Sequence, residues 1–124
     1  MSYLLVFLFG GVGCILRYLM GPFVQRCFEG MMFPIGTFCV NMLGCFVIGL
    51  LGQLSESKGF FQGDMRAAFF IGLLGGFTTF SSFGFETFNL LRDGQFLYAT
   101  ANAVGQLVLG ITFVWLGFAL GRLL

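Results

Sequence analysis

The sequence lacks histidine altogether, and only 9% of its 124 residues are charged. Without histidine, the chain has no side chain that ordinarily exchanges a proton near neutral pH, and it also lacks the commonest metal ligand. The basic residues stand singly along the chain, at Arg17, Arg26, Lys58, Arg66, Arg92 and Arg122. Nucleic-acid binding requires a basic stripe or patch. We therefore expect no nucleic-acid partner, and nothing in the sequence implies another protein as a partner.

The cysteines also lack a functional pattern. Cys14, Cys27, Cys39 and Cys45 show no CxxC or other metal-ligand spacing, so a zinc site is not expected. Small apolar thiols packed between helices account for them best. They carry no information about the function.

Hydrophobic residues are what the sequence has in excess. They make up 58% of the chain, and the mean hydropathy is +0.98, which a soluble domain of this size cannot sustain. The segment from Met1 to Met20 opens without a charge and stays apolar for longer than a secretory signal does. We interpret it as the first membrane span.

Four segments are long enough to cross a bilayer as helices, which takes about 20 apolar residues. They run from Tyr3 to Gly21, Phe33 to Leu54, Ala67 to Leu91 and Phe96 to Leu123. The connectors between them carry nearly all the charge and leave no room for a soluble domain. The sequence therefore predicts an all-α integral membrane protein, with residues 1–124 forming a single four-helix domain.

The distribution of basic residues between the two ends of the spans is almost even. An even number of spans puts Lys58, Arg66 and Arg122 on one side of the membrane and Arg26 and Arg92 on the other. Orientation follows the asymmetry of lysine and arginine, so near balance permits insertion both ways. We hypothesise an antiparallel, dual-topology homodimer.

Glycine is abundant inside the spans rather than in the connectors. The 20 glycines include pairs at small-xxx-small spacing, Gly72 with Gly76 and Gly117 with Gly121. Such pairs let helix backbones approach closely in lipid. Glycine is also simply common in membrane helices, but its density here favours tight helix packing.

The third span contains a polar interruption that runs from Gly75 to Phe83 as Gly-Gly-Phe-Thr-Thr-Phe-Ser-Ser-Phe. Paired glycines followed by four hydroxyls predict a break in the helix at mid-membrane depth. A break exposes backbone carbonyls and amides, which are tolerated in lipid only beside protein or a watery cavity. Broken helices of this kind indicate an ion site.

Three sequence segments carry a resemblance to a known family. They are Gly13-x-x-x-Arg17, Gly36-Thr37-x-x-x-Asn41-x-x-Gly44, and the run from Gly75 to Phe83. In this order and spacing the chain resembles the bacterial CrcB family, also called Fluc fluoride channels, over essentially its whole length. The resemblance implies four spans with an interrupted third helix, location in the bacterial inner membrane as a multi-pass protein, and fluoride conduction. One departure is Ser82, where the family usually has threonine.

Fluoride is small and strongly hydrated, so a pore must replace its water with donors that do not trap it. The sequence offers neutral donors: the Asn41 amide, the hydroxyls of Thr79, Ser81 and Ser82, and the ring edges of Phe80 and Phe83. A ring edge is positive and can face an anion. With 19 phenylalanines in the chain, only the resemblance singles out these two as pore residues.

Other polar residues in the spans complete the predicted pathway. An intramembrane amide such as Asn41 is either interhelical glue or part of a polar path, and the resemblance implies that it binds fluoride directly. Tyr98, Asn102 and Gln106 recur every four residues in the last span and are predicted to line the same path. Glu86 is expected near the far vestibule or hydrogen-bonded between helices. Arg17 either snorkels to the interface or forms an electropositive vestibule.

The resemblance further implies a structural sodium ion at the dimer axis, held by the backbone carbonyls of Gly75 and Thr78. Antiparallel symmetry would give two equivalent pores. Passive export through them would protect the cell from fluoride.

Other functional classes fit the sequence less well. A small dual-topology, proton-coupled multidrug transporter needs a carboxylate in its first span, and Met1 to Gly21 contains none. An enzyme would have only the Thr78 to Ser82 hydroxyls as nucleophiles and no base to activate them, so we expect no enzymatic activity. A purely structural membrane subunit would leave the polar interruption without a purpose.

Overall fold

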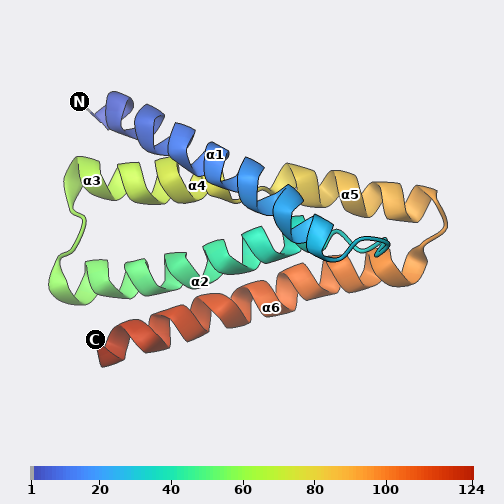
Figure 1. Ribbon diagram of the computed structural model, residues 1–124. Helices are drawn as coiled ribbons and strands as arrows, with labels where there is room; N and C mark the ends of the chain where they lie inside the picture. The colour runs from blue at the N-terminus through green and yellow to red at the C-terminus, as the bar shows by residue number, and fades with distance from the viewer. Residues whose placement is uncertain (1) are drawn as a thin grey trace.

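The computed structural model describes residues 2–124, and the regular secondary structure within that range is all helical. The elements are α1 (Ser2–Cys27), α2 (Ile35–Lys58), α3 (Gly63–Ala67), the π-helical segment η1 (Ala68–Leu74), α4 (Gly75–Phe77), α5 (Phe80–Arg92) and α6 (Phe96–Leu123). Four rods result, since α3, η1, α4 and α5 follow one another along one line (Figure 1). Each rod is long and apolar enough to cross a membrane, which confirms the predicted all-helical, four-span class.

The two ends of the described chain lie at the same end of the bundle, beside the α2–α3 connection (Figure 1). This is the arrangement that an even number of antiparallel rods requires. The charged connectors therefore separate between the two ends of the bundle as predicted. Arg26 and Arg92 lie in the last turns of α1 and α5, while Lys58, Arg66 and Arg122 lie in the last turns of α2, α3 and α6.

Helix α1 is longer than the sequence predicted. It continues past the expected boundary at Gly21 and through Pro22 as far as Cys27. Proline removes one backbone donor, but membrane helices tolerate it because neighbouring groups satisfy the freed carbonyl. The extension changes the position of Arg17, which lies well inside the helix rather than near its end.

Helices α2 and α6 pack over most of their length through glycines. A Cβ placed on Gly117 would overlap the Phe46 carbonyl, and one on Gly49 would overlap the Val114 carbonyl. At Gly121 the added atom would lie 2.9 Å from the Gln53 Cβ. Because the close neighbours include the facing backbone, these glycines set the distance between the two helices. The predicted packing role of the Gly117 and Gly121 pair is confirmed.

Helix α1 crosses the third rod just before its break, again on glycine. A Cβ on Gly13 would overlap the Leu73 carbonyl, and one on Gly76 would lie 2.5 Å from the Gly10 carbonyl oxygen. A Cβ on Gly72 would lie 2.9 Å from the Val6 carbonyl oxygen of α1. The predicted Gly72 and Gly76 pair therefore lets α1 pack closely against η1 and α4. This contact brings Arg17 beside the break.

Candidate functional site

The third rod is interrupted at Thr78 and Thr79, inside the segment where a break was predicted. Both residues are extended, with ψ of 161° at Thr78 and a φ of −152° and ψ of 115° at Thr79. Helix α4 ends at Phe77 and α5 begins at Phe80. The Thr79 hydroxyl accepts a hydrogen bond from the Ser82 amide at 3.2 Å, so Thr79 is the N-cap of α5.

The interruption leaves the carbonyls of residues 75–78 without their ordinary helical donors. The Thr79 amide, which a continuous helix would donate to Gly75, donates to the Asn41 side chain at 2.9 Å. The Ser82 amide, which would donate to Thr78, donates to the Thr79 hydroxyl instead. The two carbonyls that the resemblance assigned to sodium, those of Gly75 and Thr78, are among these four.

Asn41 of α2 reaches across to the break and makes a closed pair with Thr79. Its Oδ1 accepts from the Thr79 amide, and its Nδ2 donates to the Thr79 carbonyl at 3.1 Å. Asn41 and Thr79 are each only 9% exposed. The Asn41 side chain thus replaces the helical acceptor that the Thr79 N–H lost. Its Nδ2 also donates to Oε1 of Gln106 on α6, at 3.1 Å.

The predicted stripe on α6 is only partly brought to this site. Gln106 bonds to Asn41, but Asn102 is fully buried and donates to the Thr87 hydroxyl at 2.9 Å. Tyr98 is 36% exposed. Gln106 lines a cavity described below, whereas Asn102 and Tyr98 line neither of the two cavities beside the break.

A cavity of about 590 Å³ opens on one side of the break and holds the two candidate pore phenylalanines. We call it the phenylalanine cavity; its polar and aromatic lining is Asn41, Thr78, Thr79, Phe80, Phe83 and Gln106. The Phe80 and Phe83 ring centroids are 5.3 Å apart, as expected for residues three apart on one helix. Phe80 is 82% exposed. None of the residues that line this cavity carries a charge.

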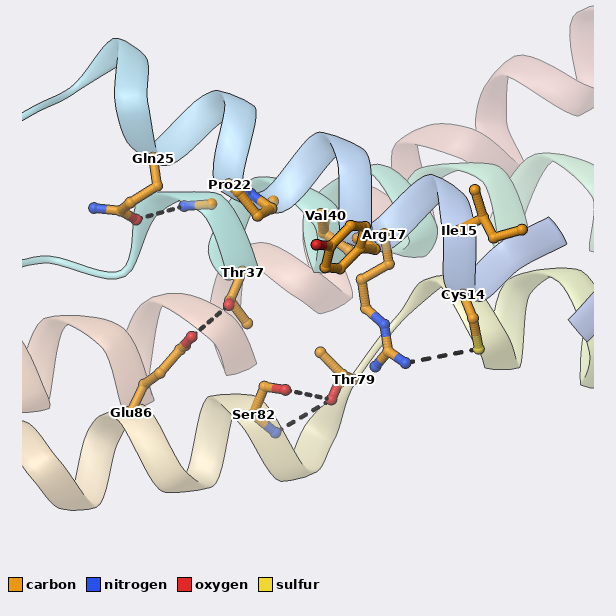
Figure 2. Close-up of a pocket in the computed structure, with 13 residues that line it drawn as sticks. Cys14, Ile15, Arg17, Pro22, Gln25, Thr37, Val40, Thr79, Ser82 and Glu86 are labelled. Carbon is orange, nitrogen blue, oxygen red and sulfur yellow. Dashed lines mark hydrogen bonds between the residues drawn. The ribbon is translucent and has the colours of Figure 1, made fainter. Parts of the chain in front are cut away.

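A second cavity of about 800 Å³ also reaches the break, at Thr79 (Figure 2). We call it the arginine cavity, because Arg17 projects into it from α1 toward Thr79 (Figure 2). Nη1 of Arg17 lies 3.5 Å from the Thr78 carbonyl oxygen, and Nη2 lies 3.8 Å from the Cys14 sulfur. The guanidinium is therefore directed at the break and not along α1 to an interface, as snorkelling would require.

Thr37 and Glu86 meet in the arginine cavity, where the Thr37 hydroxyl donates to Oε1 of Glu86 at 2.6 Å (Figure 2). Of the two positions expected for Glu86, the hydrogen-bonded one between helices is confirmed. Thr37 is not among the site residues predicted from the sequence, although it belongs to the segment that begins Gly36-Thr37 and carries the resemblance. Ser82 also lines this cavity, whereas Ser81 is exposed and lines neither cavity.

Thr79 is the one residue that lines both cavities. Its hydroxyl donates to the Ser82 hydroxyl at 3.0 Å and lies 3.3 Å from that of Ser81. The break thus places a short chain of hydroxyls between a cavity with a cationic wall and a cavity with neutral donors and aromatic edges. Such a sequence of groups can guide a small anion without a fixed counter-charge at every point.

Comparison with known proteins shows the family of the chain. Residues 4–118 match the family described as "CrcB-like protein, Camphor Resistance (CrcB)". A protein of Methylobacillus flagellatus named fluoride-specific ion channel FluC is 45% identical over 120 residues, which cover 97% of this chain and 94% of that protein. Proteins with the same name from Geotalea uraniireducens and Solibacter usitatus are 41% and 44% identical over 98% of this chain, and the matches cover 97% and 99% of their own lengths. The chain belongs to the CrcB family.

Proposed function

We propose that this protein is a fluoride-selective channel that lets fluoride cross the membrane passively, through the two cavities that meet at Thr79. The single observation that carries the proposal is the order of groups along that route: the Arg17 guanidinium, the hydroxyls of Thr79 and Ser82, and then the phenylalanine cavity. The relatives named fluoride-specific ion channel FluC supply the identity of the ion.

Each part of the route suits a hydrated anion that must lose its water and later regain it. Arg17 raises the local concentration of anions at the entry. Beyond Thr79, the donors are amides, hydroxyls and ring edges, which replace water without the deep binding that a buried cation would impose. Glu86 lines the same cavity, where the Thr37 hydroxyl donates to its Oε1 at 2.6 Å and fixes the position of the carboxylate beside α2.

We further propose that two copies pair in antiparallel orientation, with the break at mid-membrane depth, in the bacterial inner membrane. Phe80 is 82% exposed beside the phenylalanine cavity, so a second copy would complete the walls of the route. The pairing would give two equivalent pores, and passive export through them would protect the cell.

Dual topology predicts that both orientations coexist in one cell. We expect a tag at the C-terminus to be accessible from both sides of the inner membrane in comparable amounts, because the basic residues are almost evenly divided. Selective labelling in spheroplasts and in permeabilised cells measures the two fractions. A single orientation would disprove the antiparallel pair while leaving conduction open.

The freed carbonyls of Gly75 and Thr78 fit a hard monovalent cation, since neutral backbone oxygens are ligands that such ions accept. A sodium ion held there would supply positive charge to carbonyls that have lost their helical donors. In this structure Nη1 of Arg17 lies 3.5 Å from the Thr78 carbonyl oxygen. That carbonyl therefore already has one positively charged neighbour.

Proton-coupled drug transport is not favoured. Helix α1 (Ser2–Cys27) contains no aspartate or glutamate, and Glu86 is engaged by Thr37. The lining of the phenylalanine cavity contains no carboxylate, and the carboxylate in the lining of the arginine cavity is Glu86.

The proposed function is tested with liposomes that contain only the purified protein. We expect rapid fluoride release, followed with a fluoride electrode, when the potential is clamped with valinomycin, and no comparable chloride release from matched liposomes. Protein-free liposomes are the control for leakage. Absence of fluoride release from monodisperse protein would overturn the proposal and turn attention to Glu86 as a proton-coupled site.

A further inference from the structure

The phenylalanine cavity extends from the break toward the end of the bundle where the α2–α3 connection lies (Figure 1). Its lining on α2 reaches Ile48, which lies about two turns beyond Asn41 in the direction of that connection. On the third rod the lining reaches back to Phe70 of η1, about two turns before Thr78. Phe70 is therefore the aromatic residue of this lining that lies furthest from the break along the third rod.

The two consecutive phenylalanines of η1 have different surroundings. The ring centroid of Phe69 lies 5.0 Å from that of Phe9 on α1 and 4.2 Å from that of Phe61 in the α2–α3 connection. Phe70 lines the phenylalanine cavity, and Cζ of Arg66 lies over its ring, 5.5 Å from the centroid. Phe69 thus packs helices together, whereas Phe70 stands between a cation and the cavity.

The charge of Arg66 is not neutralised within the described part of the chain. The ion pair found among residues 2–124 joins Arg92 to Asp93. Arg66 does not complement a free helix end either, because the backbone continues from α3 into η1 and the Ala68 amide donates to the Asp64 carbonyl. The Arg66 side chain is exposed, so water and salt screen its charge, and an anion attracted there can leave again.

A second cation–ring pair in the same molecule provides a comparison. Cζ of Arg122 lies 4.9 Å from the Phe118 ring centroid on α6, at the same end of the bundle (Figure 1). Neither Arg122 nor Phe118 lines either cavity. Both pairs join residues four apart on one helical rod, which are ordinary neighbours. The pairs therefore differ in one respect: the ring beneath Arg66 is part of the cavity wall.

We propose that Arg66, acting through the Phe70 ring, forms a second cationic mouth of the route, at the end of the phenylalanine cavity remote from Thr79. The inference rests on the proposed function. A cation over a ring face attracts the π electrons, which leaves the ring edge more positive toward an anion. Arg17 concentrates anions at one end of the route, and Arg66 does so at the other. A passive channel needs both, because fluoride enters from either side.

The test replaces Arg66 with glutamine, which removes the charge. We expect fluoride release from phosphatidylcholine liposomes at low ionic strength to fall roughly three- to tenfold, because the mouth loses the charge that gathers fluoride. Arg122→Gln is the matched control, since it removes the same charge at the same end of the bundle from a pair outside both cavities. The control is expected to release fluoride within about twofold of the unmodified rate. Equal rates in Arg66→Gln and the unmodified protein, or equal losses in the two variants, would overturn the inference.

Salt dependence separates a mouth from a structural role. Raising the ionic strength with potassium gluconate from about 0.01 M to about 1 M shortens the screening length from about 30 Å to about 3 Å. The difference between Arg66→Gln and the unmodified protein should then nearly vanish, and Arg66→Lys should retain most of the release at low salt. A loss that is the same at both salt concentrations, with a lower thermal unfolding midpoint, would show that Arg66 only supports the fold. If the unmodified protein releases no fluoride, the proposed function itself fails.

The part played by the ring is tested with a double variant. Phe70→Leu keeps an apolar side chain but removes the ring edge from the cavity wall. If Arg66 acts through Phe70, adding Arg66→Gln to Phe70→Leu should lower fluoride release much less than Arg66→Gln does alone. Losses that multiply would show that Arg66 acts on the ion without the ring, and would overturn this part of the inference.

Discussion

Replacing Phe80 with isoleucine is expected to reduce fluoride release from liposomes roughly ten- to a hundredfold. The two side chains are similarly apolar, so the change leaves the hydrophobic character of the phenylalanine cavity intact. It removes the positive ring edge, and with it a partner for an ion that has lost part of its water. We take the cost to be about 1.5–3 kcal/mol, the scale of a hydrogen bond to a charged group, which equals that change in rate.

Phe85→Ile is the matched control for this prediction. Phe85 lies on the same helix, α5, and is 67% exposed, but it lines neither cavity. We expect its replacement to leave fluoride release within about twofold of the original rate, a barrier change of less than 0.5 kcal/mol. If both variants lost fluoride release equally, Phe80 would act only by supporting the helix bundle. If both kept the original rate of fluoride release, the ring edge of Phe80 would play no part in conduction.

The helical architecture was predictable because it depends on composition over long windows. A span of about 20 apolar residues leaves the backbone no alternative to a helix in lipid. The break was predictable for the same reason, since Gly75-Gly76 followed by Thr78 and Thr79 combines weak helix formers with side chains that cap a new helix. The exact ends of the helices were harder to predict. Helix α1 continues through Pro22 to Cys27, because groups around a membrane helix can satisfy the carbonyl that proline leaves without a donor.

The contacts that define the site were not predictable from the sequence alone. The Asn41 bonds to Thr79 and to Gln106 join residues 38 and 65 positions apart, and those from Arg17 to Thr78 and from Thr37 to Glu86 span 61 and 49. Such pairings depend on how the rods rotate about their axes. The four-residue spacing correctly placed Asn102 and Gln106 on one face of α6. Asn102, however, donates to the Thr87 hydroxyl, and of these two residues only Gln106 lines the phenylalanine cavity.

Gly13→Ala is expected to destabilise the protein by about 1–3 kcal/mol or more, the cost of overpacking a filled interior. The added Cβ would overlap the Leu73 carbonyl and lie 2.9 Å from the Phe77 amide nitrogen. Both neighbours are backbone atoms, so no change of rotamer relieves the clash, and α1 must move away from η1 and α4. Because that movement also carries Arg17 away from Thr78, fluoride release should fall together with the thermal unfolding midpoint in detergent.

Gly11→Ala provides the comparison on the same helix, since no heavy atom outside the local helix backbone lies within 4 Å of its Cβ position in the described structure. Alanine is the better helix former by up to about 1 kcal/mol, so this variant should unfold at the same temperature as the original protein or slightly higher. The opposite signs expected two residues apart separate a packing requirement from helix propensity. If Gly13→Ala were as stable as Gly11→Ala, the approach of α1 to the break would be looser than the glycine contact requires, and the position of Arg17 beside Thr78 would need another cause.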